Sequence, residues 1–290
     1  MIAPKQPAQP DEVARHYNDL DEFYRDVWGE HVHHGFWVTG RESADDAVEN
    51  LVHDVVRSLG LESGQQVCDV GCGYGGTSRL LAREYGAHVT GLTVSEAQCE
   101  FANRESDGLP VRFLVCPWEQ NSFEPDSFDA VVSIECVSHI NDKSEYFRQI
   151  QRVLRPGGRA SVVAWLANEN SGKTAVRHLL EPICREGRLP GMATSDEYRS
   201  MIAANGLVLD EFENISRSVR KTWRICARRL LGKLMTRAKY AKALFDRRNS
   251  NRVFVLTLFR ILIAYYTGSM RYGIFRIHKP ETESDVAGRS

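Results

Sequence analysis

Short apolar runs alternate with segments of helical periodicity through the middle of the chain. Five runs have the character of buried strands, and helix-like segments follow three of them. The runs are 65–71, 87–94, 111–116, 128–135 and 158–167, and the helical segments are 75–85, 95–106 and 142–154. This alternation is typical of an α/β fold with a doubly wound, mainly parallel sheet, whose ligand binds at the carboxyl ends of the strands.

The flanking segments follow other patterns. Helical spacing of aromatic and apolar residues over 11–30 predicts a helical lid at 1–43, ahead of a core at 44–170. Residues 171–252 look mostly helical and interrupt the alternation, so we expect a helical cap inserted after the fifth strand. The last segment, 253–290, is expected to return to the sheet through "MRYGIFRIHKP" and to end in a tail.

The composition is that of an ordinary soluble protein, with 42% hydrophobic and 26% charged residues and a formal net charge of -1. A balance so close to neutral gives no overall attraction to nucleic acid. The first ten residues lack the apolar segment of a secretory signal, so we expect a cytoplasmic protein with seven reduced cysteines. The most apolar run, Val253–Tyr266, is short for a bilayer span and contains Arg260.

A glycine-rich turn follows the first predicted strand. Gly71, Gly73 and Gly76 fit the spacing G-x-G-x-x-G, which is found in nicotinamide dinucleotide sites. Such sites also need an acidic residue about twenty positions further on, to bind the ribose hydroxyls. Leu92 and Thr93 stand there instead. The residues therefore disfavour a nicotinamide-dependent oxidoreductase, which we keep as an alternative.

Three stretches together resemble the class I S-adenosylmethionine-dependent methyltransferases. They are "VCDVGCGYGG" at 67–76, "FDAVVSIE" at 128–135 and "RVLRPGGRA" at 152–160. The segments 16–37, 134–143 and 270–280 further resemble the tocopherol C-methyltransferase branch, which includes bacterial methyltransferases of terpenoids and other secondary metabolites. The resemblance implies S-adenosylmethionine as the cofactor. A non-catalytic binding module with this fold is a second alternative.

The resemblance assigns cofactor contacts to residues at the strand ends. Asp69, Gly71 and Gly73 would line the methionine part of the cofactor, and Thr93 and Gln98 would bind the ribose in place of the usual acid. A hydroxyl and an amide can still hydrogen-bond a diol.

At the adenine position, "VCPWEQ" departs from the family pattern because its usual acid is missing. Trp118 would supply a stacking face there, and Glu119 is the candidate for the acidic role. Tyr17 matches a family tyrosine near the methyl group and would serve both cofactor binding and catalysis.

Glu135 and His139 are candidates for catalysis because they stand four residues apart after the fourth strand, and one helical turn would face both toward the cleft. His139 would act as a general base or orient the acceptor. The segment "WGEHVHHGFW" supplies the expected acceptor contacts Trp28, His34 and Phe36. Its histidines lack a recognised set of metal-ligand spacings, so no metal is expected.

The expected acceptor is a small lipophilic molecule, either isoprenoid, aromatic or another secondary metabolite. Aromatic faces and a carboxylate suit the cation that forms when carbon is methylated, which favours C-methylation over O- or N-methylation. The basic segment Arg217–Arg260 has three interpretations: a solvated helix face, a membrane-surface patch, or a pocket for an anionic acceptor. No nucleic acid is expected, and a homo-oligomer is left open.

Overall fold

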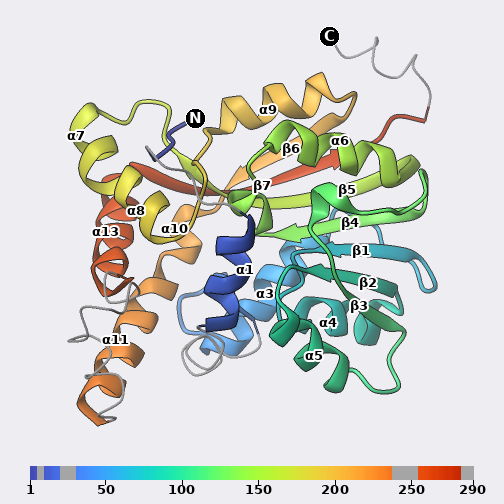
Figure 1. Cartoon of the computed structure of the whole chain (residues 1–290), viewed down its shortest axis with the longest axis horizontal. Helices are drawn as coiled ribbons and strands as arrows, with labels where there is room; N and C mark the ends of the chain where they lie inside the picture. Colours follow the sequence, from blue (N-terminus) through green and yellow to red (C-terminus); the bar gives the residue numbers. More distant parts are fainter. Residues whose placement is uncertain (5–9, 20–30, 237–253, 282–290) are drawn as a thin grey trace.

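A computed structural model describes residues 1–4, 10–19, 31–236 and 254–281 of the chain (Figure 1). Its centre is a seven-stranded sheet in the order β3-β2-β1-β4-β5-β7-β6. The strands are β1 Gln66–Val70, β2 His88–Thr93, β3 Val111–Val115, β4 Phe128–Ile134, β5 Leu154–Ala167, β6 Val208–Asn214 and β7 Met270–His278. The first five pair in parallel, and β7 runs antiparallel between β5 and β6. The predicted doubly wound, mainly parallel sheet is confirmed.

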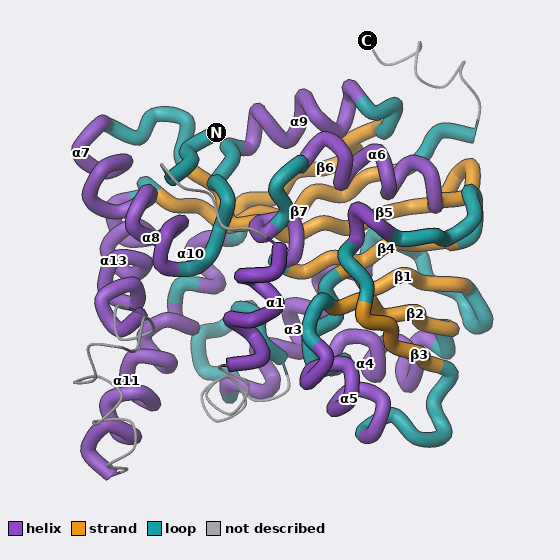
Figure 2. Tube along the Cα trace, in the orientation of Figure 1, coloured by secondary structure: helices purple, strands orange, loops and turns teal. Residues whose placement is uncertain are grey.

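The helices described are arranged around this sheet (Figure 2). They are α1 Pro10–Asp19, α3 Ala44–Val56, α4 Gly76–Tyr85, α5 Glu96–Arg104, α6 Lys143–Val153, α7 Lys173–Ala175, α8 Glu181–Glu186, α9 Ser195–Ala204, α10 Ser216–Val219, α11 Lys221–Thr236 and α13 Phe254–Thr267. Short turns of 3-10 helix, η1 Trp118–Gln120 and η2 Cys136–His139, follow β3 and β4, and a turn of π-helix, η3 Val176–Leu180, precedes α8. None of the described helices is long and apolar enough to cross a membrane.

The core has two layers because successive strand residues point to opposite faces of the sheet. In β4, Val132 packs with the α3 and α4 side chains, whereas Val131 packs with those of α6 and α9. Sequential βα units thus cover both faces and bring the ends of β1, β2 and β4 to one edge. That edge holds the cavity described below.

The C-terminal third differs in detail from the sequence prediction. The expected helical cap contains the strand β6, which pairs with β7, and the segment from 253 begins its described part with the helix α13. α13 packs against α8 and α11, so the described part of the apolar run is a helix of the cap rather than an approach to the sheet. The predicted lid helix is described as α1 to Asp19, and its continuation lies outside the described residues.

Candidate active site

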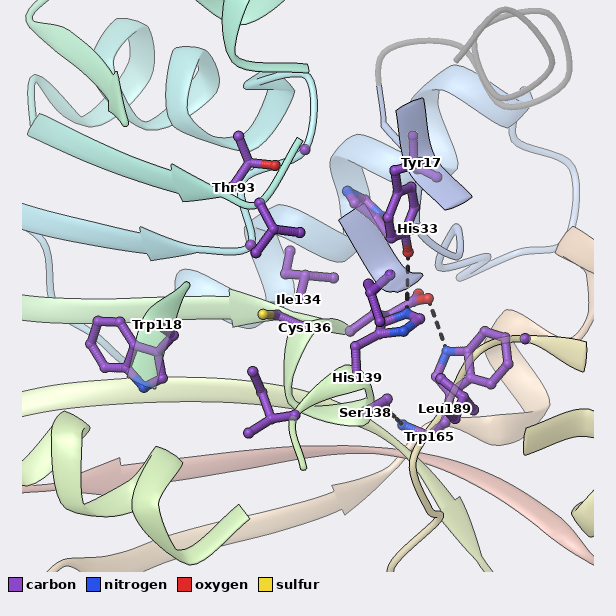
Figure 3. Close-up of a pocket in the computed structure, with 18 of the residues that line it drawn as sticks. Tyr17, His33, Thr93, Trp118, Ile134, Cys136, Ser138, His139, Trp165 and Leu189 are labelled. Carbon is purple, nitrogen blue, oxygen red and sulfur yellow. Dashed lines mark hydrogen bonds between the residues drawn. The ribbon is translucent and has the colours of Figure 1, made fainter. Parts of the chain in front are cut away.

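A cavity opens at the carboxyl ends of β1, β2 and β4, and its lining comes from two groups of residues (Figure 3). One end is formed by the glycine loop and the turns after β2 and β3. The other end is formed by α1, the segment 32–34, η2, β5 and the cap helices. We call the first the glycine-loop end and the second the cap end.

The glycine loop is held by the neighbouring strand. The backbone N–H groups of Gly71 and Cys72 both donate to the carbonyl of Leu92, over 2.9 and 2.8 Å. Gly71 has φ +78, and a Cβ there would lie 2.5 Å from the Cβ of Cys136, so a side chain is excluded by packing. Gly73 has φ +54, but an added Cβ would meet no atom within 4 Å. Because Gly73 lines the cavity, this space is where a ligand can approach the backbone.

Thr93 and Gln98 lie side by side at the glycine-loop end, both almost fully buried. The Thr93 hydroxyl donates to the Gln98 side-chain oxygen over 2.7 Å and accepts from the backbone N–H of Ser95 over 3.2 Å. The Ser95 hydroxyl caps α5 by accepting from the Gln98 backbone N–H. Since its oxygen is engaged, the group that Gln98 would offer to a ribose diol is its amide NH₂.

Trp118 forms a wall of the same end. Its indole N–H donates to the carbonyl of Tyr146 over 3.1 Å, which fixes the ring and leaves the cavity an aromatic surface rather than a donor. Glu119 also lines the cavity, and burial raises the pKa of its carboxyl. Both residues therefore lie where the adenine was expected.

Asp69 does not line the cavity. Its side chain is 2% exposed and accepts a hydrogen bond of 2.6 Å from the hydroxyl of Ser78, at the start of α4. Burial raises the pKa of Asp69 to about 6, although the hydrogen bonds from Ser78 oppose the shift. Asp69 therefore fastens the first strand to α4, and this geometry argues against the direct cofactor contact that the resemblance implies.

At the cap end, Tyr17 and His139 form a hydrogen-bonded pair, with 3.1 Å between the Tyr17 hydroxyl and His139 Nε2 (Figure 3). His139 Nδ1 lies 3.4 Å from the carbonyl of Arg188, which can only accept, so Nδ1 carries the proton and Nε2 is the basic atom. Burial lowers the pKa of His139 to about 4, and the imidazole is neutral near pH 7.

Glu135 precedes η2 and has the unusual backbone angle φ +66 for a residue other than glycine. Strain of this kind persists where surrounding contacts determine the conformation. Those contacts are hydrogen bonds to both carboxylate oxygens: Oε1 accepts from His34 and from the Tyr272 hydroxyl, and Oε2 accepts from the Trp165 indole. Glu135 and His139 both line the cavity, as the four-residue spacing suggested.

Burial alone would raise the pKa of Glu135, but the interaction with His34 through charge and hydrogen bonds lowers it to about 2. His34 Nδ1 lies 2.7 Å from the carboxylate, while Nε2 accepts from the Trp223 indole over 2.6 Å. A proton on His34 Nδ1 is therefore directed at Glu135. The cap end thus contains an ionised carboxylate fixed among aromatic rings.

Trp165, Leu189, Trp223 and Ile261 line the cap end but were not predicted as site residues. They come from β5, the turn after α8, α11 and α13. Each looks like an ordinary core residue in the sequence. Only the contacts of Glu135 and His34 with the two tryptophans would have indicated the site, and these join positions far apart in the chain.

The three acceptor contacts expected from "WGEHVHHGFW" differ in where the structure places them. His34 lines the cavity, with its polar atoms engaged as above. Phe36 does not line it; the ring packs against the core beside α3, which argues against its assignment as an acceptor contact. Trp28 lies outside the described residues.

The histidines of this segment bind one another rather than forming an evident metal site. His31 Nδ1 lies 3.2 Å from His33 Nε2, and His33 Nδ1 donates to the carbonyl of His34. Burial lowers the pKa of His31 to about 3. Within the described ranges, no group of three or more His, Cys, Asp or Glu residues is placed to hold a metal ion.

Helix α1 joins the two ends of the cavity. Val13 and Tyr17 face the cavity, and Tyr17 reaches His139 at the cap end. Asn18 accepts a 2.6 Å hydrogen bond from the Ser95 hydroxyl at the glycine-loop end. The predicted lid helix therefore lies across the junction of the two ends.

A sheet in the order β3-β2-β1-β4-β5-β7-β6 with β7 antiparallel, together with a glycine loop and a cavity at the strand ends, is typical of the class I S-adenosylmethionine-dependent methyltransferases. The family described as mycolic acid cyclopropane synthetase matches residues 5–258. The chain belongs to that family, and it is an S-adenosylmethionine-dependent methyltransferase that acts on small molecules. This membership argues against the oxidoreductase and non-catalytic alternatives.

Three known proteins show the breadth of the likeness. The chloroplastic tocopherol O-methyltransferase of Arabidopsis thaliana is 28% identical over 295 residues, covering 92% of this chain and 82% of that protein. The glycine/sarcosine/dimethylglycine N-methyltransferase of Actinopolyspora halophila is 32% identical and covers 69% of this chain and 36% of that protein. The structure of geranyl diphosphate C-methyltransferase from Streptomyces coelicolor A3(2), bound to S-adenosyl-L-homocysteine, has a TM-score of 0.72 at 19% identity and covers 96% of this chain and 100% of that one.

Proposed function

We propose that this methyltransferase acts on a carbon atom of a small lipophilic acceptor, of isoprenoid or aromatic character. The observation that carries the proposal is the cap end of the cavity, where an ionised carboxylate and a neutral histidine lie among aromatic and aliphatic side chains. Relatives named for oxygen, nitrogen and carbon methylation share the fold, so the choice among acceptor atoms rests on this chemistry.

The glycine-loop end fits S-adenosylmethionine. Gly73 leaves the backbone open to the cavity, the Gln98 amide can donate to a ribose, and Trp118 offers a flat surface to adenine. When bound there, the cofactor supplies a methyl group whose bond to sulfur breaks as the bond to the acceptor forms, leaving S-adenosylhomocysteine. Tyr17 and α1 would then cover the junction between cofactor and acceptor and exclude water.

The walls of the cap end favour an apolar acceptor. Ile134, Ile140, Leu189 and Ile261 supply aliphatic surface. The polar groups nearby are largely bonded to one another, as in the network around Glu135, so few remain for a hydrophilic acceptor. Burial of an apolar molecule against these side chains contributes roughly 25 cal/mol per Å² of apolar surface removed from water. The name of the Arabidopsis relative also points to an acceptor with a lipophilic tail.

The protonation states favour carbon as the reacting atom. Methylation of an electron-rich ring or alkene leaves a cation, which the Glu135 carboxylate and the faces of Trp165 and Trp223 can stabilise. That cation is a strong acid, so a base with a pKa of about 4, such as His139, is sufficient to remove its proton. A phenol or alcohol is a much weaker acid and would be better served by a base titrating near neutral pH.

Tyr17 supplies the route for that proton. Its hydroxyl donates to His139 Nε2, so its oxygen can accept a proton from the acceptor while its own passes to the imidazole. The acceptor then has one methyl group more and one proton fewer, and His139 becomes an imidazolium.

The test compares three types of acceptor in separate reactions. The enzyme would be incubated with S-adenosylmethionine carrying a deuterated methyl group and one of three probes: a phytylated hydroquinone, a small catechol or sarcosine. The position of the label would be read by NMR. The proposal predicts label on a ring carbon of the phytylated compound. Label only on oxygen or on nitrogen would overturn it.

A further inference from the structure

An exposed apolar stripe runs along α13. Phe259, Ile263 and Tyr266 recur at helical spacing and are 56%, 49% and 57% exposed. Leu231 and Met235, one turn apart on α11, are exposed as well. Five of the nine large hydrophobic side chains that are exposed in the described part of the chain therefore lie on two adjacent helices. Concentration of this kind marks a surface that another body covers.

Cations border the stripe. Arg217, Arg224 and Arg228 are exposed on α10 and α11, and the sequence has no Asp or Glu from Ile215 to Phe245. Arg220 lies over the ring of Tyr266, 5.0 Å from its centroid. A hollow beside this ring is lined by Arg217, Arg220 and Arg271, of which Arg271 pairs with Glu169. The surface is therefore apolar at its centre and positive at its edge.

Not every cation of the basic segment belongs to this surface. Lys221 donates to the carbonyl of Gly40 and lies over the ring of Trp37. Arg260 pairs with the buried Glu186, which also accepts a hydrogen bond from Thr257. Lys221 therefore ties α11 to the segment 37–40 and Arg260 ties α13 to α8, whereas Arg217, Arg224 and Arg228 are exposed.

We infer that this face of α10, α11 and α13 docks on an anionic lipid surface. Interfacial helices combine exposed apolar side chains with Lys and Arg in this way, and anionic headgroups attract each cation. A symmetric pairing of two copies through this face would gather the arginines of both copies in one interface, to which the stretch from Ile215 to Phe245 brings no Asp or Glu, and this disfavours a second copy as the occupant. Figure 1 shows α11 extending from the body of the molecule next to α13, with which it is in contact.

The inference rests on the proposed lipophilic acceptor and says where the enzyme would take that acceptor from, namely the lipid phase. On its other side, α13 lines the cavity through Thr257 and Ile261, and α11 does so through Trp223. The same two helices are thus the docking surface and the wall of the cap end. An acceptor dissolved in the lipid would need to pass only this layer of side chains to reach Glu135 and His139.

The experiment is cosedimentation of the full chain with phosphatidylcholine vesicles, with and without phosphatidylglycerol. We expect binding to the anionic vesicles, weakened by salt, and little to phosphatidylcholine alone. R224E/R228E should lower the partition coefficient at least about tenfold, because each cation near the surface contributes to the attraction. F259S/I263S should lower it similarly. The matched control R104E/R148E makes the same charge change on α5 and α6 and should bind as the parent does.

S-adenosylhomocysteine binding, measured by calorimetry on each variant, separates this inference from the proposed function. Retained cofactor binding with no vesicle binding by the parent overturns the docking surface and leaves the methyltransferase assignment intact. An equal loss of vesicle binding by R104E/R148E would overturn the docking surface too, since the attraction to the vesicles would then depend on net charge alone. A dimer in which α13 becomes protected from hydrogen exchange would replace the lipid by a second copy.

Discussion

The two ends of the cavity are built in opposite ways. The glycine-loop end consists largely of backbone and of side chains within a few residues of the ends of β1, β2 and β3. Hydrogen bonds between neighbouring strands set its shape, as where Leu92 accepts from the glycine loop. The cap end consists of side chains from widely separated segments, fixed by a network in which Glu135 and His34 are the central members.

The difference indicates a division of labour. A backbone-built end can hold the same ligand in many relatives because changes of side chain alter it little. An end built from long-range side-chain contacts can change its acceptor through a few substitutions, as expected of sites carried on a common fold. Substitutions at the cap end should therefore affect turnover, whereas substitutions in the glycine loop should affect cofactor affinity.

The largest effect on turnover is expected from His139→Ala. Removing the base should lower kcat by 10²–10⁴-fold, a typical range for general-base catalysis, while S-adenosylhomocysteine affinity stays within about threefold. Tyr17→Phe keeps the ring and removes the hydroxyl, so it should give a smaller loss of the same kind. A near-normal kcat for His139→Ala with the true acceptor would reduce His139 to a packing role.

Glu135→Gln should cost about 10²-fold in kcat, since it removes the charge that would stabilise a cation. The NH₂ group of the glutamine would also point at another hydrogen-bond donor, either Trp165 or the groups that donate to Oε1. Because a buried donor would then lack an acceptor, the variant should unfold at a lower urea concentration. The measurement that separates the two roles of Glu135 is S-adenosylhomocysteine affinity, compared with kcat in the same variant. If it fell as far as kcat, the carboxylate would be supporting the whole cavity rather than the acceptor.

Acid should destabilise the fold in part through His139. Its pKa is lowered from 6.5 to about 4, so the unfolded chain takes up the proton first and stability falls as the pH drops through this window. The contribution between pH 7 and pH 5 is on the order of 1–2 kcal/mol. Urea unfolding at the two pH values should show a smaller drop for His139→Gln than for the parent. Equal drops would mean that His139 is not protected from protonation.

The smallest effect is expected from Asp69→Asn. Asp69 contacts Ser78 and not the cavity, and an Asn oxygen can accept the same hydrogen bond. Affinity for S-adenosylhomocysteine should change by less than about threefold, at the level of one retained hydrogen bond. A loss of a hundredfold in calorimetry would return Asp69 to the cofactor site.

The sheet and the glycine-loop end could be predicted because their signals are local. Strand, glycine turn and helix follow one another within twenty residues from Gln66. Thr93 ends β2, and Gln98 and Trp118 follow the ends of β2 and β3 by a few residues. Asp69 shows the limit of such reasoning. Its place before the glycines was right, but side chains alternate along a strand, and only the fold shows that this one points to Ser78.

The cap end could be predicted only in part. Glu135 and His139 follow a strand, so their position was evident, but the partners that fix them come from elsewhere in the chain. β6 was missed because the strand sequence "VLDEFEN" is rich in acidic residues, and its pairing with β7 decides its conformation. Phe36 was assigned to the acceptor by its neighbourhood, yet its ring packs against the core, whereas His34, two residues earlier, lines the cavity.

The central claim is that the cofactor occupies the open space beside Gly73. Calorimetric titration of Gly73→Val with S-adenosylhomocysteine tests it most directly, with Gly108→Val as the control. Both glycines have positive φ, +54 and +75, and neither has an atom within 4 Å of an added Cβ, so the backbone strain is similar. Only Gly73 lines the cavity. We predict no detectable binding by folded Gly73→Val and near-parental affinity for Gly108→Val; parental affinity in folded Gly73→Val would contradict the account.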